Sequence, residues 1–310
     1  MRGESDTESL AELLKLLDEV GYSFTSITPA THERILARRK GEHARDLRDI
    51  FGWSMSFERD LLPGPMLDLL RETDSLEEDG NLLRSRLRVS ELAGRLFLHS
   101  AYPTEDENAV FFGPDTYRFA RFLERQLGDE PVRTLVDYGA GGGAGGILAS
   151  GLVEPERTVL LDSNPDALRL AEANALAAGI AVKLVEGADL SQVEGEIDLV
   201  IANPPFIADA HGREYRDGGG IGTDQSLDWT RDSVQRLAPG GRMLLYTGSP
   251  VIAGEDRLLA ALAEIADDAG CTLSYEELDP DIFGEELDEP AYRKAEVERI
   301  AAVGAVITRT

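Results

Sequence analysis

The second half of the chain alternates short apolar runs with longer amphipathic segments. Five runs rich in Val, Leu and Ile predict buried strands: TLVDYG, TVLLD, VKLVEG, IDLVIAN and GRMLLYTG. The stretches between them have apolar residues at helical spacing, as in 165–179 and 226–241. This alternation predicts βαβ units, in which helices cover both faces of a parallel sheet. Two further runs, CTLSYEEL and IAAVGAVITRT, predict strands after a helix in EDRLLAALAEIADDAG.

The first 105 residues have a different pattern. Helical spacing predicts helices over 8–20, 31–40, 44–51 and 65–72, with a break at LLPGPM. Two alternating runs on either side of SELAG predict a β-hairpin. We therefore expect a smaller N-terminal domain, 1–105, and an α/β domain, 106–310. The smaller domain is either a winged-helix-like module or a helical cap on the larger one.

Loops are predicted in the polar segments 75–80, 103–108 and 279–290. The net charge of −27, from 31 basic and 58 acidic residues, excludes a protein that coats nucleic acid with its whole surface. No apolar run approaches the ~18 residues that a membrane-spanning helix needs. Since Cys271 is the only cysteine and the N-terminus lacks a signal-like pattern, we expect a cytoplasmic location without a disulfide framework.

A glycine-rich turn follows the first strand of the larger domain. Asp137 ends this strand, and Gly139, Gly141 and Gly143 precede a helix. Glycines permit a sharp turn and a close approach of a ligand, and the helix start offers free N–H groups. Asp162 ends the next strand, where a carboxylate can accept hydrogen bonds from ribose hydroxyls. This combination predicts a nucleoside site, and it also fits the loose dinucleotide fingerprint of an NAD-dependent oxidoreductase.

The segment NPPF distinguishes these alternatives. Asn203, Pro204, Pro205 and Phe206 follow the fourth strand, at the sheet edge where open α/β folds bind their ligands. A dehydrogenase would have no use for this segment. The ordered motifs over 131–310 resemble the class I S-adenosylmethionine-dependent methyltransferases, and among them the amino-methylating group with an NPPY or NPPF motif.

This resemblance implies a Rossmann-like, seven-stranded sheet and S-adenosylmethionine as cofactor. It assigns Asp189 to the adenine amino group, although the usual Gly-Asp pair is interrupted here by Ala188. The stretch VFFGPDTYRFA is similar to one in the small-methyltransferase and release-factor glutamine methyltransferase families. It implies that the donor pocket is lined by Phe112, Pro114 and Thr116; alternatively, these residues only connect a strand to a helix.

The NPPF segment suits methylation of a planar amino group, whose delocalised lone pair is a weak nucleophile. The side-chain oxygen of Asn203 and the carbonyl of Pro204 can each accept an N–H and aim the lone pair at the methyl donor. The prolines keep these acceptors rigid, and Phe206 is expected to be an exposed surface for stacking. A sulfonium donor needs no metal, and the four scattered histidines predict no metal site.

The loop HGREYRDGGGIGTDQ, which contains Arg213 and Arg216, follows the NPPF segment. It is either a lid that closes over the target or a plain flexible connection.

Three substrate classes are open. The stretch 31–48 has a local charge of +3, from six basic and three acidic residues, and Arg84, Arg86 and Arg88 alternate along a predicted strand. If these form a recognition helix and a wing, the target is an exocyclic amine in RNA or DNA, which we take as the first expectation. The alternatives are a glutamine amide in a protein such as a release factor or ribosomal protein, and a small-molecule amine.

Overall fold

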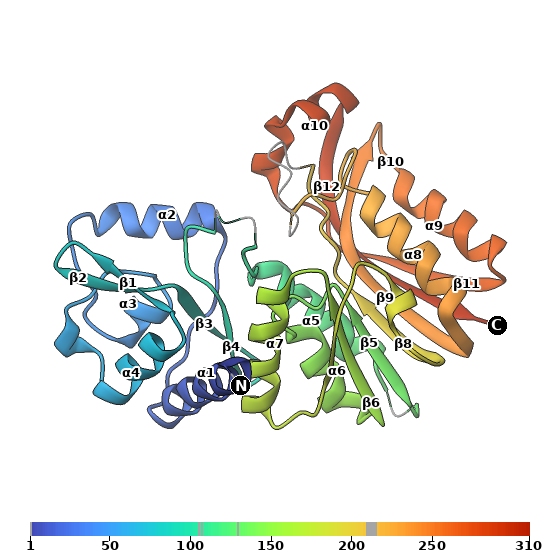
Figure 1. The fold of residues 1–310 in the computed structure, drawn as a ribbon. Coiled ribbons are helices and arrows are strands. Elements are labelled where there is room, and N and C mark those ends of the chain that lie inside the picture. Colours follow the sequence, from blue (N-terminus) through green and yellow to red (C-terminus); the bar gives the residue numbers. More distant parts are fainter. Residues whose placement is uncertain (1, 105, 107, 129, 209–215) are drawn as a thin grey trace.

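The computed structural model describes residues 2–104, 106, 108–128, 130–208 and 216–310 (Figure 1). Over these residues, one large sheet has seven strands in a continuous order, with β10 (Glu255–Asp256) pairing to β9 at the side. The order is β11 (Cys271–Asp279), β12 (Val297–Arg309), β9 (Leu237–Ile252), β8 (Ile197–Ala202), β5 (Thr134–Tyr138), β6 (Arg157–Asp162) and β7 (Lys183–Glu186). The strands from β9 to β7 are parallel, and β12 is antiparallel to both its neighbours. The predicted α/β class with a Rossmann-like sheet is confirmed.

Helices cover both faces of the sheet. The helices are α5 (Pro114–Gln126), α6 (Ala144–Val153), α7 (Pro165–Ala178), α8 (Asp224–Arg236) and α9 (Arg257–Asp268), with a short 3₁₀ turn η2 (Leu190–Gln192). Phe119 and Phe122 of α5 belong to the hydrophobic cluster on one face. Val234 of α8 and Leu262 of α9 belong to the cluster on the other. The polypeptide therefore returns to the same sheet edge after each helix, as the alternating pattern predicted.

The N-terminal part contains helices and two hairpins. The elements are α1 (Arg2–Glu19), α2 (Pro29–Arg38), α3 (Leu47–Phe51), η1 (Arg59–Leu61), α4 (Gly64–Glu72), and the pairs β1 (Leu76–Asp79) with β2 (Leu82–Ser85) and β3 (Leu87–Leu92) with β4 (Arg95–Ser100). The prediction of a loop over 75–80 is wrong, because these residues contribute to the β1–β2 hairpin. Its acidic strand is half exposed, and a polar strand of this kind gives no apolar signal in the sequence.

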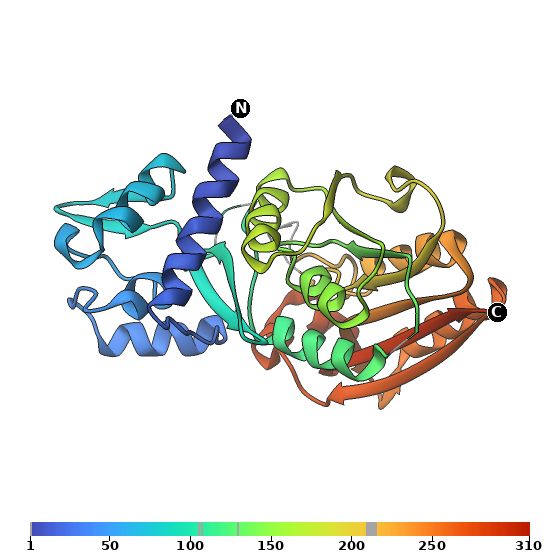
Figure 2. The same ribbon diagram turned by 90° about the horizontal axis from the view of Figure 1, so that it is seen from below.

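The hydrophobic core of the N-terminal part continues into α7. Leu10, Leu13 and Leu17 of α1 belong to the same buried cluster as Ala167 and Leu170 of α7. Figure 2 shows α1 lying between α7 and the other N-terminal helices. The β3–β4 hairpin is buried along most of its length, so it does not project as a free wing.

A helical segment connects β11 to β12, where the sequence predicted a loop over 279–290. It consists of η3 (Gly284–Asp288) and α10 (Pro290–Ala295), and it stands above β12 at the top of Figure 1. The buried ring of Tyr292 attaches this segment to the molecule, because its hydroxyl accepts the N–H of Ala208 at 2.9 Å.

Among the described helices, none combines the length and apolar character that a membrane crossing requires.

Candidate active site

A cavity of about 400 Å³ lies at the edge of the sheet where β5, β6 and β8 end. Its walls come from the glycine turn after β5, the end of β6, the NPPF segment after β8 and the linker that precedes α5. Ligands bind at this edge in open α/β sheets, since the loops between strands and helices meet there. The predicted motifs are therefore gathered around one space.

The glycine turn has the backbone that the motif predicted. Gly139, Gly141 and Gly143 all have positive φ angles, of 73°, 52° and 78°. A Cβ at Gly139 would lie only 2.1 Å from the ring of Trp229, whereas one at Gly141 would meet nothing within 4 Å. Gly139 and Gly141 line the cavity, while Gly143 starts α6 and packs against Ala171. Gly143 shapes the turn without lining the cavity.

Asp137 is buried beneath this turn, with 2% of its surface exposed. Its Oδ2 accepts the N–H of Gly146, in the first turn of α6, at 2.6 Å. Burial raises the pKa of Asp137 to about 7, against the opposing effect of that hydrogen bond. Asp137 therefore fixes the start of α6 and places a titratable group at the base of the cavity.

Asp162 lies at the end of β6 and also lines the cavity. Its carboxylate accepts the N–H of Gly141 at 2.7 Å and the N–H of Asn164 at 2.9 Å. These bonds orient the carboxylate and tie the glycine turn to the neighbouring strand. The position matches the one expected for a ribose-binding acid.

Asp189 is not where the resemblance implied. Its side chain is exposed, and Oδ1 accepts the N–H of Ser191 at 2.8 Å as the cap of η2. These hydrogen bonds from Ser191 hold the pKa of Asp189 below its usual value. Gly187 and Ala188 line the cavity in its place. The extra residue in GAD has moved the carboxylate away from the cavity wall.

An aromatic pair that the sequence analysis missed forms another wall. The rings of Tyr138 and Trp229 stack at 4.1 Å between centroids with an angle of 9°, and both residues line the cavity. Trp229 Nε1 is buried and has no hydrogen-bond partner among the described residues. Trp229 lies on α8, and its place in the helical pattern gave no signal that it faces a ligand.

In the NPPF segment, Asn203 and Pro205 line the cavity and Pro204 is buried behind them. The side-chain oxygen of Asn203 is buried and has no hydrogen-bond partner within the described part of the chain. An unpaired buried acceptor is unfavourable by about 1–3 kcal/mol, so this oxygen is poised to accept an N–H from a ligand.

The expectation that Phe206 is an exposed stacking surface is wrong. Only 7% of it is exposed, and its ring packs edge-on against Phe283 at 5.7 Å and Tyr246 at 6.2 Å. Both partners lie far along the chain, in the segment after β11 and in β9, so the motif alone could not reveal this burial. The exposed aromatic side chain at the cavity is Phe111, with 38% of its surface accessible.

Of the three residues in the stretch VFFGPDTYRFA that are expected to line the donor pocket, two line the cavity. Phe112 and Thr116 do so, whereas Pro114 occupies the first position of α5 outside the lining. The hydroxyl of Thr116 accepts the N–H of Gly113 at 3.2 Å, which caps the helix. Thr116 thus both lines the cavity and caps α5.

The glycine-rich loop packs closely against the NPPF segment. Gly218 donates its N–H to the carbonyl of Ile207 at 2.8 Å, and Ile207 donates to the carbonyl of Arg216 at 3.1 Å. A Cβ at Gly222, where φ is 91°, would lie 2.3 Å from the carbonyl oxygen of Phe206. The described end of the loop therefore supports the NPPF segment. Arg213, which belonged to the predicted lid, lies outside the described residues.

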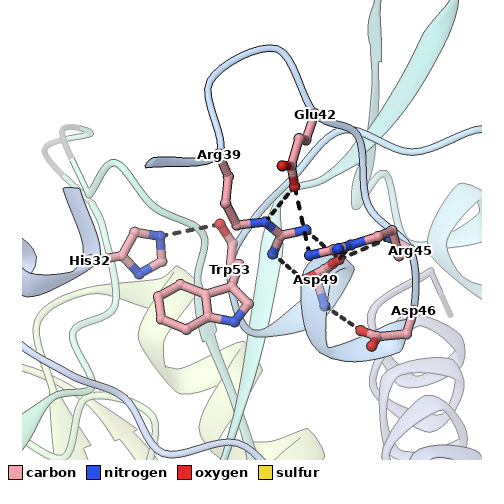
Figure 3. A network of polar contacts seen from close by, with 7 residues as sticks. All are labelled: His32, Arg39, Glu42, Arg45, Asp46, Asp49 and Trp53. Carbon is pink, nitrogen blue, oxygen red and sulfur yellow. Dashed lines mark hydrogen bonds and ion pairs between the residues drawn. The ribbon is translucent and has the colours of Figure 1, made fainter. Parts of the chain in front are cut away.

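Much of the predicted basic surface is used inside the N-terminal part. Arg39 forms two hydrogen bonds with the buried carboxylate of Asp49, at 2.5 and 2.8 Å, and Glu42 contacts both Arg39 and Arg45 (Figure 3). Asp49 lies one residue beyond the stretch whose charge predicted a basic face. Arg88 is buried and donates to the carbonyl of Gly52 at 2.9 Å.

Four basic residues of the stretch, Arg34, Arg38, Lys40 and Arg48, form no ion pair with other described residues, although Arg48 donates to the carbonyl of Ser23. The recognition surface proposed from sequence is therefore reduced to these four side chains and to Arg86, whose side chain is half exposed and contacts Glu77.

Known proteins resemble the chain in the same region. Residues 106–251 match the model of the methyltransferase small domain. The chain is 27% identical over 212 residues to a release factor glutamine methyltransferase of Deinococcus radiodurans, covering 64% of this chain and 75% of that protein. It is 30% identical over 227 residues to a ribosomal protein L11 methyltransferase of Pelotomaculum thermopropionicum, covering 68% and 66% respectively.

Among solved structures, Trm5b of Pyrococcus abyssi aligns with a TM-score of 0.50 at 15% identity, over 76% of this chain and 62% of that one, a likeness in fold alone. The curated relatives are matched over 48% to 75% of their own lengths.

The cavity suits S-adenosylmethionine on its own evidence. Gly141 leaves open space beside the backbone, Asp162 presents an oriented carboxylate, and Tyr138 and Trp229 offer an aromatic wall. From its fold, these residues and its relatives, the chain belongs to the class I S-adenosylmethionine-dependent methyltransferases, with a methyltransferase small domain over residues 106–251.

Proposed function

We propose that this enzyme methylates a planar nitrogen that Asn203 holds, and that the nitrogen belongs to a side-chain amide of a protein. The observation that carries the proposal is the buried side-chain oxygen of Asn203, which has no partner among the described residues and belongs to the cavity wall. A glutamine amide or a base amine would supply the missing N–H. The same contact would orient the nitrogen lone pair into the cavity.

Each part of the cavity has a role in this scheme. Gly139, Gly141 and Asp162 hold the cofactor, which when bound supplies an electrophilic methyl group on a positive sulfur. Pro204 and Pro205 lack N–H groups, so they cannot compete for the oxygen of Asn203, and their fixed φ angles keep its backbone rigid. Phe112 and Thr116 line the wall on the side of α5. The residues then act by positioning and need no strong base.

Three observations favour a protein over a nucleic acid. Phe206 is buried, so it offers no surface for a flipped base. Arg39, Arg45 and Arg88 are engaged within the N-terminal part, and the overall charge of −27 suits a basic polypeptide partner. The relatives that match most of the α/β part are named for a release factor and a ribosomal protein.

The test separates cofactor binding from methyl transfer. Asn203→Ala should bind S-adenosylhomocysteine with nearly unchanged affinity in calorimetry, yet lose transfer by roughly 100-fold, the scale of a mispositioned reactant. Asn81→Ala, in the exposed turn between β1 and β2, is the matched control and should change neither quantity. Equal losses of binding and transfer in Asn203→Ala would contradict the assigned role.

The substrate class is tested with radiolabelled cofactor on protein, RNA and DNA fractions of the source cell. Label in the protein fraction, recovered as an N-methylated amide after enzymatic digestion and as methylamine after acid hydrolysis, supports the proposal. Label in RNA or DNA would reject the protein substrate and retain the planar nitrogen, with Arg34, Arg38 and Lys40 as the first basic contacts to examine.

A further inference from the structure

A buried amide side chain joins the N-terminal part to the glycine turn. Asn174 lies on α7 with 1% of its surface exposed. Its Oδ1 accepts the N–H of Leu98 at 2.8 Å, and its Nδ2 donates to the carbonyls of Leu98 at 3.1 Å and Gly142 at 2.8 Å. Every N–H of this amide is used, as a buried polar group requires.

The amide takes the place of a missing strand partner. Leu98 of β4 lies opposite Val89 of β3. The carbonyl of Val89 accepts a hydrogen bond from the hydroxyl of Tyr22 at 2.9 Å, so it faces away from β4. In an antiparallel ladder, such a pair directs its N–H and C=O groups outward. Both outward groups of Leu98 are bonded to the side chain of Asn174. The amide of Asn174 thus binds β4 in the way that a backbone peptide of a neighbouring strand would, and it fixes β4 to α7.

The other side of the amide fixes the glycine turn. Gly142 lies between Gly141, whose N–H is bonded to Asp162, and Gly143, which starts α6. A Cβ at Gly142 would lie 3.3 Å from the carbonyl oxygen of Leu98, so the turn and the hairpin are in close contact. A shift of β4 relative to α7 would therefore move the peptide next to the groups that face the cofactor.

The hairpin itself reaches the cavity. His99, the next residue of β4, lines the cavity, and its ring stacks on Phe112 at 5.1 Å. Its Nε2 is hydrogen-bonded to the hydroxyl of Ser90 on β3 at 2.9 Å. At the end of β4, the N–H of Ser100 bonds to the carbonyl of Val110, another residue of the cavity wall. The N-terminal part thus supplies one side of the cofactor site.

We propose that Asn174 is a positioning residue that makes cofactor binding depend on the β3–β4 hairpin, whatever the methylated substrate is. The N-terminal part then has a second role besides any contact with the target. It holds the glycine turn in the conformation that accepts the cofactor. Coupling of this kind between two regions typically changes affinity by about 5- to 150-fold.

The test uses the full chain and three variants. Asn174→Leu removes all three bonds at similar size, and Asn174→Asp keeps only an acceptor for Leu98. Thr7→Val is the matched control, because Thr7 joins α1 to Glu172 of the same α7 at 2.9 Å without touching the turn. Both Asn174 variants should bind S-adenosylhomocysteine on the order of tenfold more weakly in calorimetry, while the control binds normally.

Two readouts separate positioning from general loss of stability. The KM for the cofactor should rise while kcat at saturating cofactor changes little, which a partly unfolded enzyme would not show. In hydrogen exchange of the unaltered protein, S-adenosylhomocysteine should slow the amides of 95–100 as well as those of 137–146, and leave 76–85 unchanged. This second experiment does not depend on whether the variants fold.

Protection confined to 137–146 would overturn the proposal, as would unchanged affinity in a folded Asn174→Leu protein. An equal loss of affinity in Thr7→Val would also overturn it, because loosening the interface anywhere would then be sufficient.

Discussion

At the scale of single residues, Asp137 connects the chemistry of the cavity to the stability of the fold. Its buried carboxyl holds the N–H of Gly146, and its pKa is raised to about 7 by burial. Because the ordinary value is 3.8, the folded protein retains a proton that the unfolded chain releases between pH 4 and pH 7. The free energy of unfolding that depends on Asp137 therefore falls as the pH rises through this range. Above the range it no longer changes with pH.

This gives a prediction for Asp137→Asn. Asparagine keeps an acceptor for the N–H of Gly146 but has no charge, so the variant should gain stability relative to the unaltered protein as the pH rises from 4.5 to 7.5. The free energies of unfolding in urea, measured for both proteins at each pH, provide the difference. Effects of titrating groups that do not interact with Asp137 cancel in that difference, and a value that does not change with pH would disprove the raised pKa.

The local motifs identified Asp137, Gly139, Gly141, Asp162 and Asn203 because their roles depend on backbone geometry near a strand end. Side chains whose direction depends on distant partners were not predictable. The burial of Phe206 depends on Phe283 and Tyr246, and Asp189 turned away because of one inserted alanine. Trp229 and Asn174 lie in regular helical patterns, which do not show what a buried polar or aromatic side chain contacts.

At the scale of elements, the glycine-rich loop is a support for the NPPF segment. Gly222 has a φ of 91° and leaves no room for a Cβ beside the carbonyl of Phe206. Gly222→Ala should therefore displace that segment and lower methyl transfer at least tenfold, with S-adenosylhomocysteine affinity nearly unchanged.

Gly254→Ala is the control for backbone strain alone, since Gly254 also has a positive φ, of 74°, with no atom within 4 Å of its Cβ position. It should lower stability slightly and leave transfer intact. Equal losses of transfer in the two variants, measured at saturating cofactor, would argue against the supporting role of the loop.

The elements that the sequence predicted well are those with a buried apolar face. The strands β5, β6 and β8 and the helices α4 and α7 fall where the periodicity placed them, within a few residues, and α1 ends as predicted but begins six residues earlier, at Arg2. The β1 strand, η3 and α10 were missed. The strand β1 and the turn η3 lie in acidic segments with few apolar side chains, and α10, with six residues, is too short to show a periodic pattern. Their conformation comes from partners, a facing strand for β1 and the pocket around Tyr292 for α10.

At the scale of the whole molecule, the continuous core between α1 and α7 predicts that both parts unfold together. Leu170 is fully buried in this core. Leu170→Ala should lower the free energy of unfolding by about 2–5 kcal/mol. Leu259→Ala, on the exposed side of α9, should have little effect.

The two tryptophans of the chain make cooperativity measurable, since Trp53 lies in the N-terminal part and Trp229 in the α/β part. Trp53→Phe and Trp229→Phe proteins each report one part by fluorescence. Their urea unfolding curves should coincide, after allowance for the stability of each variant, and loss of the Trp53 signal well before the Trp229 signal would refute a shared core.

The shared core also has a consequence for biosynthesis. The helix α1 leaves the ribosome before α7, yet part of the surface that covers its leucines comes from α7, which ends at Ala178. At the usual rate of roughly 5–20 residues per second, synthesis of the stretch between β4 and the buried Ala173 takes about 4–15 seconds. During that interval α7 cannot yet cover its share of the apolar face of α1, so folding of the N-terminal part is completed only after synthesis has passed α7.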